Sequence, residues 1–231
     1  MSALRKLVVT IDGPAGAGKS TVSKLLAERL GYLYMDTGAM YRAVAVLARE
    51  SSPENPVDDA LLVDICRGLE VCMKCENNKM RLIVNGRDLT EEIRQTDIGA
   101  LASAVSAKAV VRRRLGEIQR QLGADGGIVA EGRDMGTVVF PQADVKFFLD
   151  ARPEVRGRRR YRELLAKGEK RLTLPQVYEQ LVTRDRNDQG RELAPLKPAA
   201  DAIFIDSTGL DVQQVVALMA RTIEERSVGG A

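Results

Sequence analysis

The sequence predicts an α/β fold built on a parallel β-sheet with helices covering both faces. Short apolar runs, rich in β-branched residues, alternate with longer segments whose apolar residues recur at helical spacing. A glycine-rich segment joins the first run to the first helical segment. Strands that alternate with helices are typical of a parallel sheet, because each crossover helix returns the chain to the same end of the sheet.

Short apolar runs are the expected strands, and the longer periodic segments are the expected helices. The runs are apolar throughout, which is typical of strands buried on both faces. Gly31 stands where a helix C-cap glycine is expected. The strands are Leu7–Ile11, Tyr32–Met35, Ile128–Ala130, Val145–Leu149 and Ala202–Ile205; the helices are Lys19–Leu30, Ala107–Leu122, Glu154–Lys167 and Leu174–Arg184.

The segment from residue 69 to residue 89 departs from this alternation. Apolar residues such as Met73 alternate there with polar ones such as Lys74, which is the period of a half-buried strand. Asn77-Asn78 predicts a turn, and Asn85-Gly86 is a strong signal for a type I′ hairpin turn. We therefore expect a small antiparallel meander inserted into the α/β core.

The composition is that of an ordinary soluble protein. The 231 residues are 45% hydrophobic and 29% charged, and the net charge is only +3. No apolar run approaches the ~18 residues of a membrane span, and the N-terminus lacks a signal-peptide pattern. The mixed charges disfavour non-specific nucleic-acid binding. We expect a cytoplasmic monomer that binds neither membranes nor nucleic acid.

The three cysteines and the absence of histidine narrow the chemistry. Cys72 and Cys75 form a C-x-x-C pair, but no second pair and no histidine completes a zinc site, so we expect a packing role. An odd number of cysteines fits a reducing compartment. Without histidine, Ser-His and Cys-His catalysis are excluded.

A phosphate-binding loop follows the first expected strand. Residues 13–20 match G-x-x-x-x-G-K-[ST], between an apolar strand and an amphipathic helix. Glycines let successive backbone N–H groups turn toward phosphate oxygens, beside a helix N-terminus with partial positive charge. Lys19 is expected to reach the β- and γ-phosphates, and Ser20 to bind Mg²⁺. The expected ATP-binding residues are Gly13, Pro14, Ala15, Gly16, Ala17, Gly18, Lys19, Ser20 and Thr21.

The phosphate loop does not identify the acceptor of the phosphoryl group. A guanine-specific GTPase would carry an [NT]-K-x-D element, which the chain lacks. A kinase needs cations that hold a second, anionic substrate. Arginine suits this task, because guanidinium stays charged and binds phosphate through two N–H groups. Arginines occur on polar segments that follow expected strands or a helix, namely Tyr34–Arg42, Glu131–Gly136 and Arg184–Arg191.

These segments carry a family resemblance. Over nearly its whole length the chain resembles the bacterial cytidylate (CMP) kinases, which belong to the nucleoside monophosphate kinase family. The resemblance implies a transferase of pyrimidine nucleotide metabolism that moves the γ-phosphoryl group of Mg-ATP to CMP or dCMP, giving CDP or dCDP and ADP. The matching stretches are 11–21, 36–42, 132–141, 194–196 and 199–208, of which 132–141 is the most specific.

The resemblance also implies an organisation for the chain. Residues 1–231 would form one P-loop kinase chain, with a five-stranded parallel sheet flanked by helices. The meander would belong to an inserted subdomain that binds the nucleoside monophosphate, at about residues 64–104. A short helical lid would span about residues 153–170, where Arg156 and Arg160 would act with Lys19 as catalytic residues around the transferring phosphate.

The acceptor site follows from the resemblance position by position. The expected holders of the CMP phosphate are Thr37, Arg42, Arg133 and Arg191; the expected readers of cytosine are Ser103, Arg112 and Asp134; the expected sugar contacts are Arg184 and Asp188.

The acceptor chemistry needs no general base. A phosphate monoester has a second pKa near ~6 and is largely dianionic at neutral pH. Catalysis then depends on positioning and on neutralising charge. For base choice, a carboxylate at Asp134 can accept a hydrogen bond from the cytosine N4 amine but opposes the uracil O4 carbonyl. We therefore expect CMP and dCMP to be preferred over UMP.

Alternatives of two kinds stay open from sequence. One is another small-substrate P-loop kinase, such as a uridylate/cytidylate or shikimate-type enzyme. The other is a nucleotide-gated binding module that uses its arginines for RNA or a protein partner. ADP release that depends on a monophosphate would indicate the enzyme, and salt-sensitive RNA binding without turnover would indicate the module.

Overall fold

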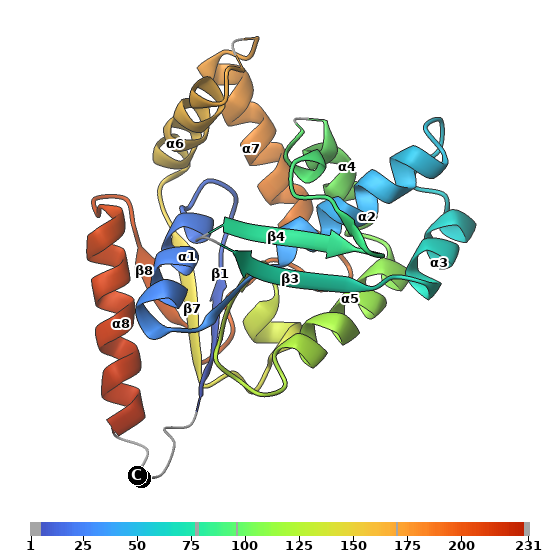
Figure 1. The fold of residues 1–231 in the computed structure, drawn as a ribbon. Coiled ribbons are helices and arrows are strands. Elements are labelled where there is room, and N and C mark those ends of the chain that lie inside the picture. The colour runs from blue at the N-terminus through green and yellow to red at the C-terminus, as the bar shows by residue number, and fades with distance from the viewer. Residues whose placement is uncertain (1–5, 77–78, 96, 170, 229–231) are drawn as a thin grey trace. The chain divides into compact units, whose positions relative to one another are not determined.

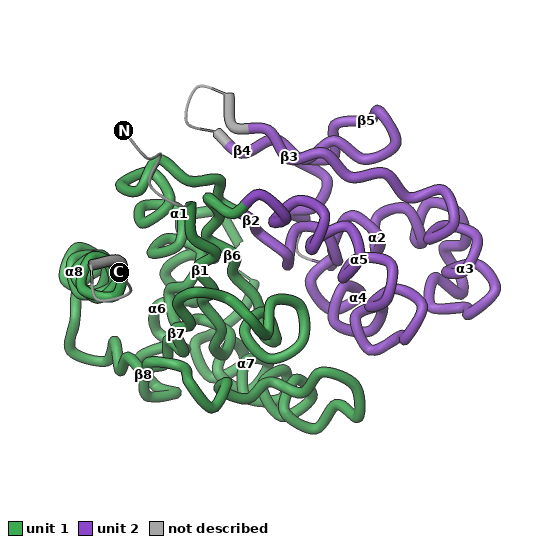
Figure 2. The backbone as a smooth tube through the Cα atoms, turned by 90° about the horizontal axis from the view of Figure 1, so that it is seen from below, with its two compact units in different colours: residues 1–34, 126–231 green, residues 35–125 purple. Residues whose placement is uncertain are grey.

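The chain divides into two compact units (Figure 2). The computed structural model describes residues 6–76, 79–95, 97–169 and 171–228. The first unit comprises residues 1–34 and 126–231, and the second comprises residues 35–125. The second unit is wider than the insert expected at about residues 64–104, and the substrate-binding role of that insert stays a prediction.

The first unit is built on a five-stranded parallel sheet (Figure 1), as predicted. Its strands, in spatial order, are β2 (Leu33–Asp36), β6 (Ile128–Gly132), β1 (Val8–Asp12), β7 (Val145–Asp150) and β8 (Ile203–Asp206). β1 lies at the centre and pairs in parallel with β6 and β7. The loops that follow β1, β6 and β7 therefore leave the same edge of the sheet, where ligands of open α/β sheets bind.

Helices α1 (Lys19–Leu30) and α8 (Val212–Val228) pack on the sheet to form the core. Val22 and Leu26 of α1 lie in one buried cluster with Phe147 of β7 and Met219 of α8. α1 has its predicted bounds, and Gly31 caps it with a φ of 66°. This burial holds the strand ends, and the loops that follow them, in place.

Three further helical elements of the first unit are a π-helical turn, η2 (Met135–Val139), and the helices α6 (Pro153–Ala166) and α7 (Leu174–Gln189). The helix was expected to end at Arg184, but α7 continues to Gln189. The helix continues because neither glycine nor proline interrupts it before Gly190. Arg184 and Asp188 are consequently one helical turn apart on a regular element.

The second unit combines a meander with helices. Its three-stranded sheet, in the order β3-β4-β5, confirms the predicted antiparallel meander. Asn85 and Gly86 have φ angles of 50° and 78°, as a type I′ turn requires. Asn77-Asn78 lies outside the described residues. The elements are α2 (Thr37–Ser51), α3 (Asp59–Arg67), β3 (Val71–Glu76), β4 (Lys79–Val84), β5 (Arg87–Asp88), the 3₁₀ helix η1 (Glu92–Arg94), α4 (Ile98–Val105) and α5 (Ala109–Leu122).

Two expectations for the second unit are corrected. Arg42 was expected on a polar loop, but it lies in α2, which begins at Thr37 because the Asp36 carboxylate accepts a hydrogen bond from the Ala39 N–H. Cys72 was expected to pack in the interior, but it is exposed while Met73 is buried. The alternation of β3 turns Cys72 outward, so the packing role does not hold for this cysteine.

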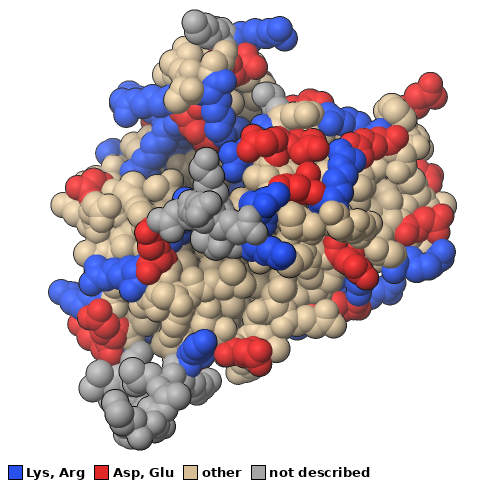
Figure 3. Space-filling model, viewed as in Figure 1, with Lys and Arg blue, Asp and Glu red and all other residues tan. Residues whose placement is uncertain are grey.

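The charged residues do not gather by sign on the face in view. Figure 3 shows lysine and arginine side chains interspersed there with aspartate and glutamate. Within the described part of the chain, no helix combines the length and apolar character needed to cross a bilayer.

Candidate active site

The phosphate loop, residues 13–20, connects β1 to α1. Its glycines have positive φ angles of 149° at Gly13, 73° at Gly16 and 96° at Gly18. A Cβ atom on Gly13 would lie 2.0 Å from the Leu149 carbonyl oxygen, so only glycine fits there. The loop runs directly into the N-terminus of α1, whose first N–H groups have no partner within the helix. This backbone is suited to binding a nucleotide phosphate.

Lys19 is buried at the start of α1, and its Nζ donates a hydrogen bond to the Pro14 carbonyl at 2.8 Å. Burial, together with the charges of Arg133 and Arg184, lowers the pKa of Lys19 to about 7. Glu131 and Asp12 act in the opposite direction. An anionic phosphate beside Lys19 would favour the charged form of the lysine, so the site favours binding of an anion.

Asp12 ends β1 and receives two backbone hydrogen bonds. The Met135 and Gly136 N–H groups donate to its carboxylate oxygens at 2.9 and 2.8 Å. Burial raises the pKa of Asp12 to about 6, although these two hydrogen bonds lower it. Asp12, the residue before the phosphate loop, is therefore hydrogen-bonded to the turn that follows β6.

Glu131 lies on the neighbouring strand, since β1 and β6 pair Ile11 with Glu131 and Asp12 with Gly132. The Tyr34 hydroxyl donates a hydrogen bond to the Glu131 carboxylate, which is buried. Sequence reasoning missed both acidic residues. The signal that could have found them is an acidic residue at the carboxyl end of each of two apolar strands, where ligands of parallel sheets bind.

Three residues expected at the acceptor nucleotide form one cluster around the buried carboxylate of Asp188. Arg133 Nε donates to Asp188 Oδ2 at 2.8 Å, and Arg191 donates to the other oxygen of the same carboxylate. Burial raises the pKa of Asp188, but the two guanidinium groups outweigh burial and lower it below its ordinary value. One carboxylate thus holds two arginines together, which concentrates positive charge suited to a phosphate dianion.

Asp134 and Arg184 lie close to this cluster. Asp134 immediately precedes η2 and is 2% exposed. Arg184 is half-buried on α7, and its charge lowers the pKa of both Lys19 and Asp188. The donor loop and part of the expected acceptor site are therefore electrostatically linked within the first unit.

In the second unit, the expected cytosine readers are linked through Ser106. Arg112 Nη1 on α5 donates to the Ser106 carbonyl at 3.0 Å, and the Ser106 hydroxyl donates to the Ser103 carbonyl at 2.8 Å. The Arg112 guanidinium also lies 5.6 Å from the centre of the Tyr41 ring. These contacts join α2, α4 and α5 around Ser103 and Arg112.

Thr37 and Arg42 share α2 in this unit. Thr37 is the first residue of the helix and is buried, whereas Arg42 is half-buried and follows Tyr41. A hydroxyl at a helix N-terminus and an arginine further along the same helix are suited to a phosphate.

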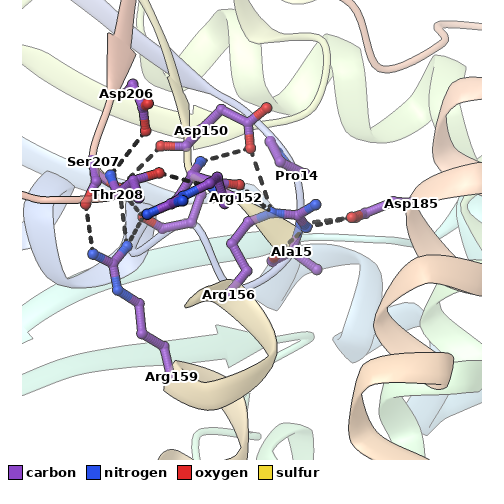
Figure 4. A network of polar contacts seen from close by, with 12 residues as sticks. Pro14, Ala15, Asp150, Arg152, Arg156, Arg159, Asp185, Asp206, Ser207 and Thr208 are labelled. Atoms are coloured by element: carbon purple, nitrogen blue, oxygen red, sulfur yellow. Dashed lines mark hydrogen bonds and ion pairs between the residues drawn. The ribbon is translucent and has the colours of Figure 1, made fainter. Parts of the chain in front are cut away.

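The two arginines expected to be catalytic on α6 differ in their surroundings. Arg160 is half-buried and pairs with Glu163 at 2.8 Å. Arg156 is 6% exposed, and its Nε and Nη1 atoms belong to a polar network that includes the phosphate loop (Figure 4). The expected contact with the transferring phosphate stays a prediction for Arg160. The Arg156 guanidinium instead contacts the backbone of the phosphate loop.

Each unit brings together its own share of the expected residues. The first unit holds Gly13–Thr21, Arg133, Asp134, Arg156, Arg160, Arg184, Asp188 and Arg191; the second holds Thr37, Arg42, Ser103 and Arg112.

Comparisons with known proteins identify the family of the chain. A family model described as cytidylate kinase matches residues 9–225. The chain is 52% identical over 232 residues to the cytidylate kinase of Citrifermentans bemidjiense, covering 100% of this chain and 99% of that protein. It is 51% identical over 224 residues to the cytidylate kinase of Geobacter sulfurreducens, covering 96% and 94% of the two chains. The chain belongs to the cytidylate kinase family.

Proposed function

We propose that this chain transfers the γ-phosphoryl group of Mg-ATP to CMP or dCMP, giving CDP or dCDP and ADP. The observation that carries the proposal is the Arg133–Asp188–Arg191 cluster, which lies in the same unit as the phosphate loop and interacts electrostatically with Lys19 through Arg133. A hydrolase needs no such second phosphate site, whereas a kinase with a phosphate acceptor does. Membership of the cytidylate kinase family supports the cytosine nucleotide as acceptor.

The proposed reaction depends on charge and position. The acceptor is already dianionic near neutral pH, so no base has to remove its proton. Arg133 and Arg191, with Thr37 and Arg42, hold the acceptor phosphate, while Lys19 and Arg160 neutralise charge on the transferring group. Such positioning and charge stabilisation provide most of the catalysis in phosphoryl transfer.

Mg²⁺ is part of the proposal. Ser20 is exposed in the first turn of α1, next to Lys19, so its hydroxyl suits an ion that also binds nucleotide phosphates. Among the described residues, no group of three or more Cys, Asp or Glu side chains could hold a metal ion unaided. Mg²⁺ takes oxygen ligands and keeps several waters, which fits a site completed by phosphate oxygens. When bound, the ion would neutralise phosphate charge.

The remaining parts of the proposal concern organisation and setting. Residues 64–104 would form the insert that binds the monophosphate, with Ser103 and Arg112 reading cytosine, and α6 would belong to a lid at residues 153–170. Arg184 and Asp188 would contact the sugar. The enzyme would act as a cytoplasmic monomer in pyrimidine nucleotide metabolism, a setting that fits the odd number of cysteines.

Asp134 is proposed to select the base. In the variant Asp134→Ala, the kcat/KM for CMP should fall by about 100-fold or more, because the cytosine N4 amine loses a charged acceptor in a buried site. Affinity for ATP should stay close to that of the wild type. The measurement is steady-state kinetics with CMP, alongside calorimetric titration with an ATP analogue. Equal losses for the two nucleotides would contradict the assignment.

The proposed function is tested by ADP production from Mg-ATP with CMP, dCMP, UMP, AMP and GMP in parallel assays. Strong turnover with CMP and dCMP, and little with the other three, is the expected result. Strong turnover with UMP would contradict the cytosine-reading role of Asp134. Absence of turnover with all five nucleotides would overturn the kinase function.

A further inference from the structure

A buried ion pair contacts both peptide groups of one phosphate-loop residue (Figure 4). The Ala15 N–H donates to Asp185 Oδ1 at 3.0 Å, and the Ala15 carbonyl accepts from Arg156 Nη1 at 2.9 Å. Arg156 Nη1 also donates to the other oxygen of Asp185. The side chains of Arg156 and Asp185 are only 7% and 9% exposed. The pair therefore fixes the orientation of the Ala15 backbone from both sides.

The remaining contacts of Arg156 tie the pair to the end of β7. Arg156 Nε donates to the Ala151 carbonyl at 2.9 Å and lies 3.4 Å from Asp150 Oδ1. The Nε and Nη1 atoms of Arg156 already have four oxygen partners, so swinging the guanidinium away toward a substrate phosphate would leave the Asp185 carboxylate buried without its cation. Such a loss is costly in a buried site.

Backbone packing brings the same elements against the loop. A Cβ atom on Gly16 would lie 2.9 Å from the Arg156 carbonyl oxygen and 3.1 Å from a methyl carbon of Leu181. The phosphate loop thus touches α6 and α7 one residue after the clamped Ala15. Gly157 similarly lets α6 approach Tyr178 of α7, where a Cβ atom would lie 3.1 Å from the ring.

Arg159 extends the contact one helical turn further along α6. Its guanidinium donates to the Ser207 hydroxyl at 2.9 Å and to the Ser207 carbonyl at 2.7 Å. The Ser207 hydroxyl in turn lies 3.3 Å from the Ala17 carbonyl in the phosphate loop. Two arginines of α6, three positions apart, therefore hold main-chain groups of the donor site, whereas Arg160 is left half-exposed.

We infer that the Arg156–Asp185 pair is a positioning clamp for the phosphate loop. The pair holds Ala15 so that the loop keeps its phosphate-binding shape, and Arg156 acts on the donor nucleotide through this loop and does not touch the transferring phosphate. The inference rests on the proposed kinase function for its kinetic consequences. The expected effect of the pair on the affinity for the donor nucleotide can be measured without turnover.

The test uses the full chain with the variants Arg156→Met, Arg156→Lys, Asp185→Asn and the double variant Arg156→Met/Asp185→Asn. The affinity for a non-hydrolysable ATP analogue with Mg²⁺ is measured by calorimetry, and kcat and KM are measured for ATP and CMP. Arg162→Met is the matched control, since Arg162 is an exposed arginine on the same helix.

For Arg156→Met, the expected result is about a 10- to 100-fold loss of analogue affinity and a matching rise in the KM for ATP, the range for losing a charge-assisted hydrogen bond. The KM for CMP should not change, and kcat should fall less than the affinity. Arg156→Lys should recover part of the loss, because an ammonium can still pair with Asp185. Arg162→Met should match the wild type.

A large fall in kcat with wild-type analogue affinity would overturn the inference, because it would place Arg156 on the transferring phosphate. If Arg156→Met does not fold, the double variant decides the question, since it leaves no unpaired buried charge. Weak analogue binding by a folded double variant supports the clamp, and wild-type binding overturns it. If the wild type produces no ADP with any monophosphate, the kinase function fails, while the analogue titrations still test the clamp.

Discussion

Two arginine–carboxylate pairs, one in each unit, have the same separation but differ in solvent exposure. Arg133 Nε lies 2.8 Å from Asp188 in the first unit, and Arg87 Nη1 lies 2.8 Å from Glu50 in the second. The side chains of the first pair are 17% and 1% exposed, whereas those of the second are 48% and 40% exposed. Water screens the exposed pair, and the buried pair has lost its hydration. The distance between the charged atoms alone therefore does not indicate which pair contributes to stability.

The comparison shows that the buried carboxylate balances more than one positive charge. Asp188 balances two guanidinium groups, so removing it would leave two cations without their carboxylate. Glu50 neutralises one exposed arginine, which water and Glu92 also reach. Substituting each carboxylate by its amide changes little in shape and isolates the effect of charge.

The largest effect is expected from Asp188→Asn. The free energy of unfolding should fall by about 3 kcal/mol, the lower end of the range for breaking a buried ion pair. Urea unfolding at neutral pH measures this loss. Inorganic phosphate should restore more stability to the variant than to the wild type, because the anion would replace the missing negative charge between the arginines. A variant as stable as the wild type would remove the distinction between the buried and the exposed pair.

An intermediate effect is expected from the buried carboxyl of Asp12. Burial raises the pKa of this carboxyl to about 6. The folded protein binds this proton more tightly than the unfolded chain, whose carboxyl has the ordinary pKa of 3.8. Asp12 therefore favours folding below about pH 4, and this contribution is lost as the pH rises to about 6. Relative to Asp12→Asn, the wild type should gain about 2 kcal/mol between pH 7 and pH 4.

Urea unfolding of both proteins across this pH range measures the Asp12 contribution. The charged groups that face Asp12, Asp134 and Lys19, are present in both proteins, so their own pH dependence largely cancels in the difference. A difference in unfolding free energy that stays constant with pH would contradict the raised pKa.

The smallest effect is expected from Glu50→Gln, the matched control for Asp188→Asn. A hydrogen bond from Arg87 lowers the pKa of Glu50, so any stabilisation is present at neutral pH and lost on acidification. Because both side chains are well exposed, the midpoint of urea unfolding at neutral pH should not differ measurably from that of the wild type. Activity should also be unchanged. A loss comparable to that of Asp188→Asn would show that burial does not separate the two pairs.

Sequence reasoning was strongest where structure depends on neighbouring residues. The phosphate loop, α1 and its Gly31 cap were predictable because a strand, glycines and a helix N-terminus follow one another within 24 residues, from Val8 to Gly31. The Asn85-Gly86 turn was predictable for the same reason, since its backbone angles depend on two residues.

Contacts between distant residues could not be predicted in this way. The hydrogen bonds that Asp12 accepts from the turn after β6 span more than 120 residues, and Arg156 meets Ala15 across 141 residues. An arginine run on an amphipathic helix does not indicate which members turn inward. The family resemblance named candidate residues for the acceptor site, but the pairing of Arg133 and Arg191 through one carboxylate became visible only in the fold.

The hydrogen bonds of Asp12 have a thermodynamic consequence for the effect of each substrate on the affinity for the other. Asp12 directly precedes the phosphate loop, and its partners Met135 and Gly136 directly follow Asp134, the proposed reader of the acceptor base. If binding of one nucleotide shifts this junction, the affinity for the other must change. Thermodynamic linkage requires the two effects to be equal, so ATP would alter CMP affinity by the same factor as CMP alters ATP affinity.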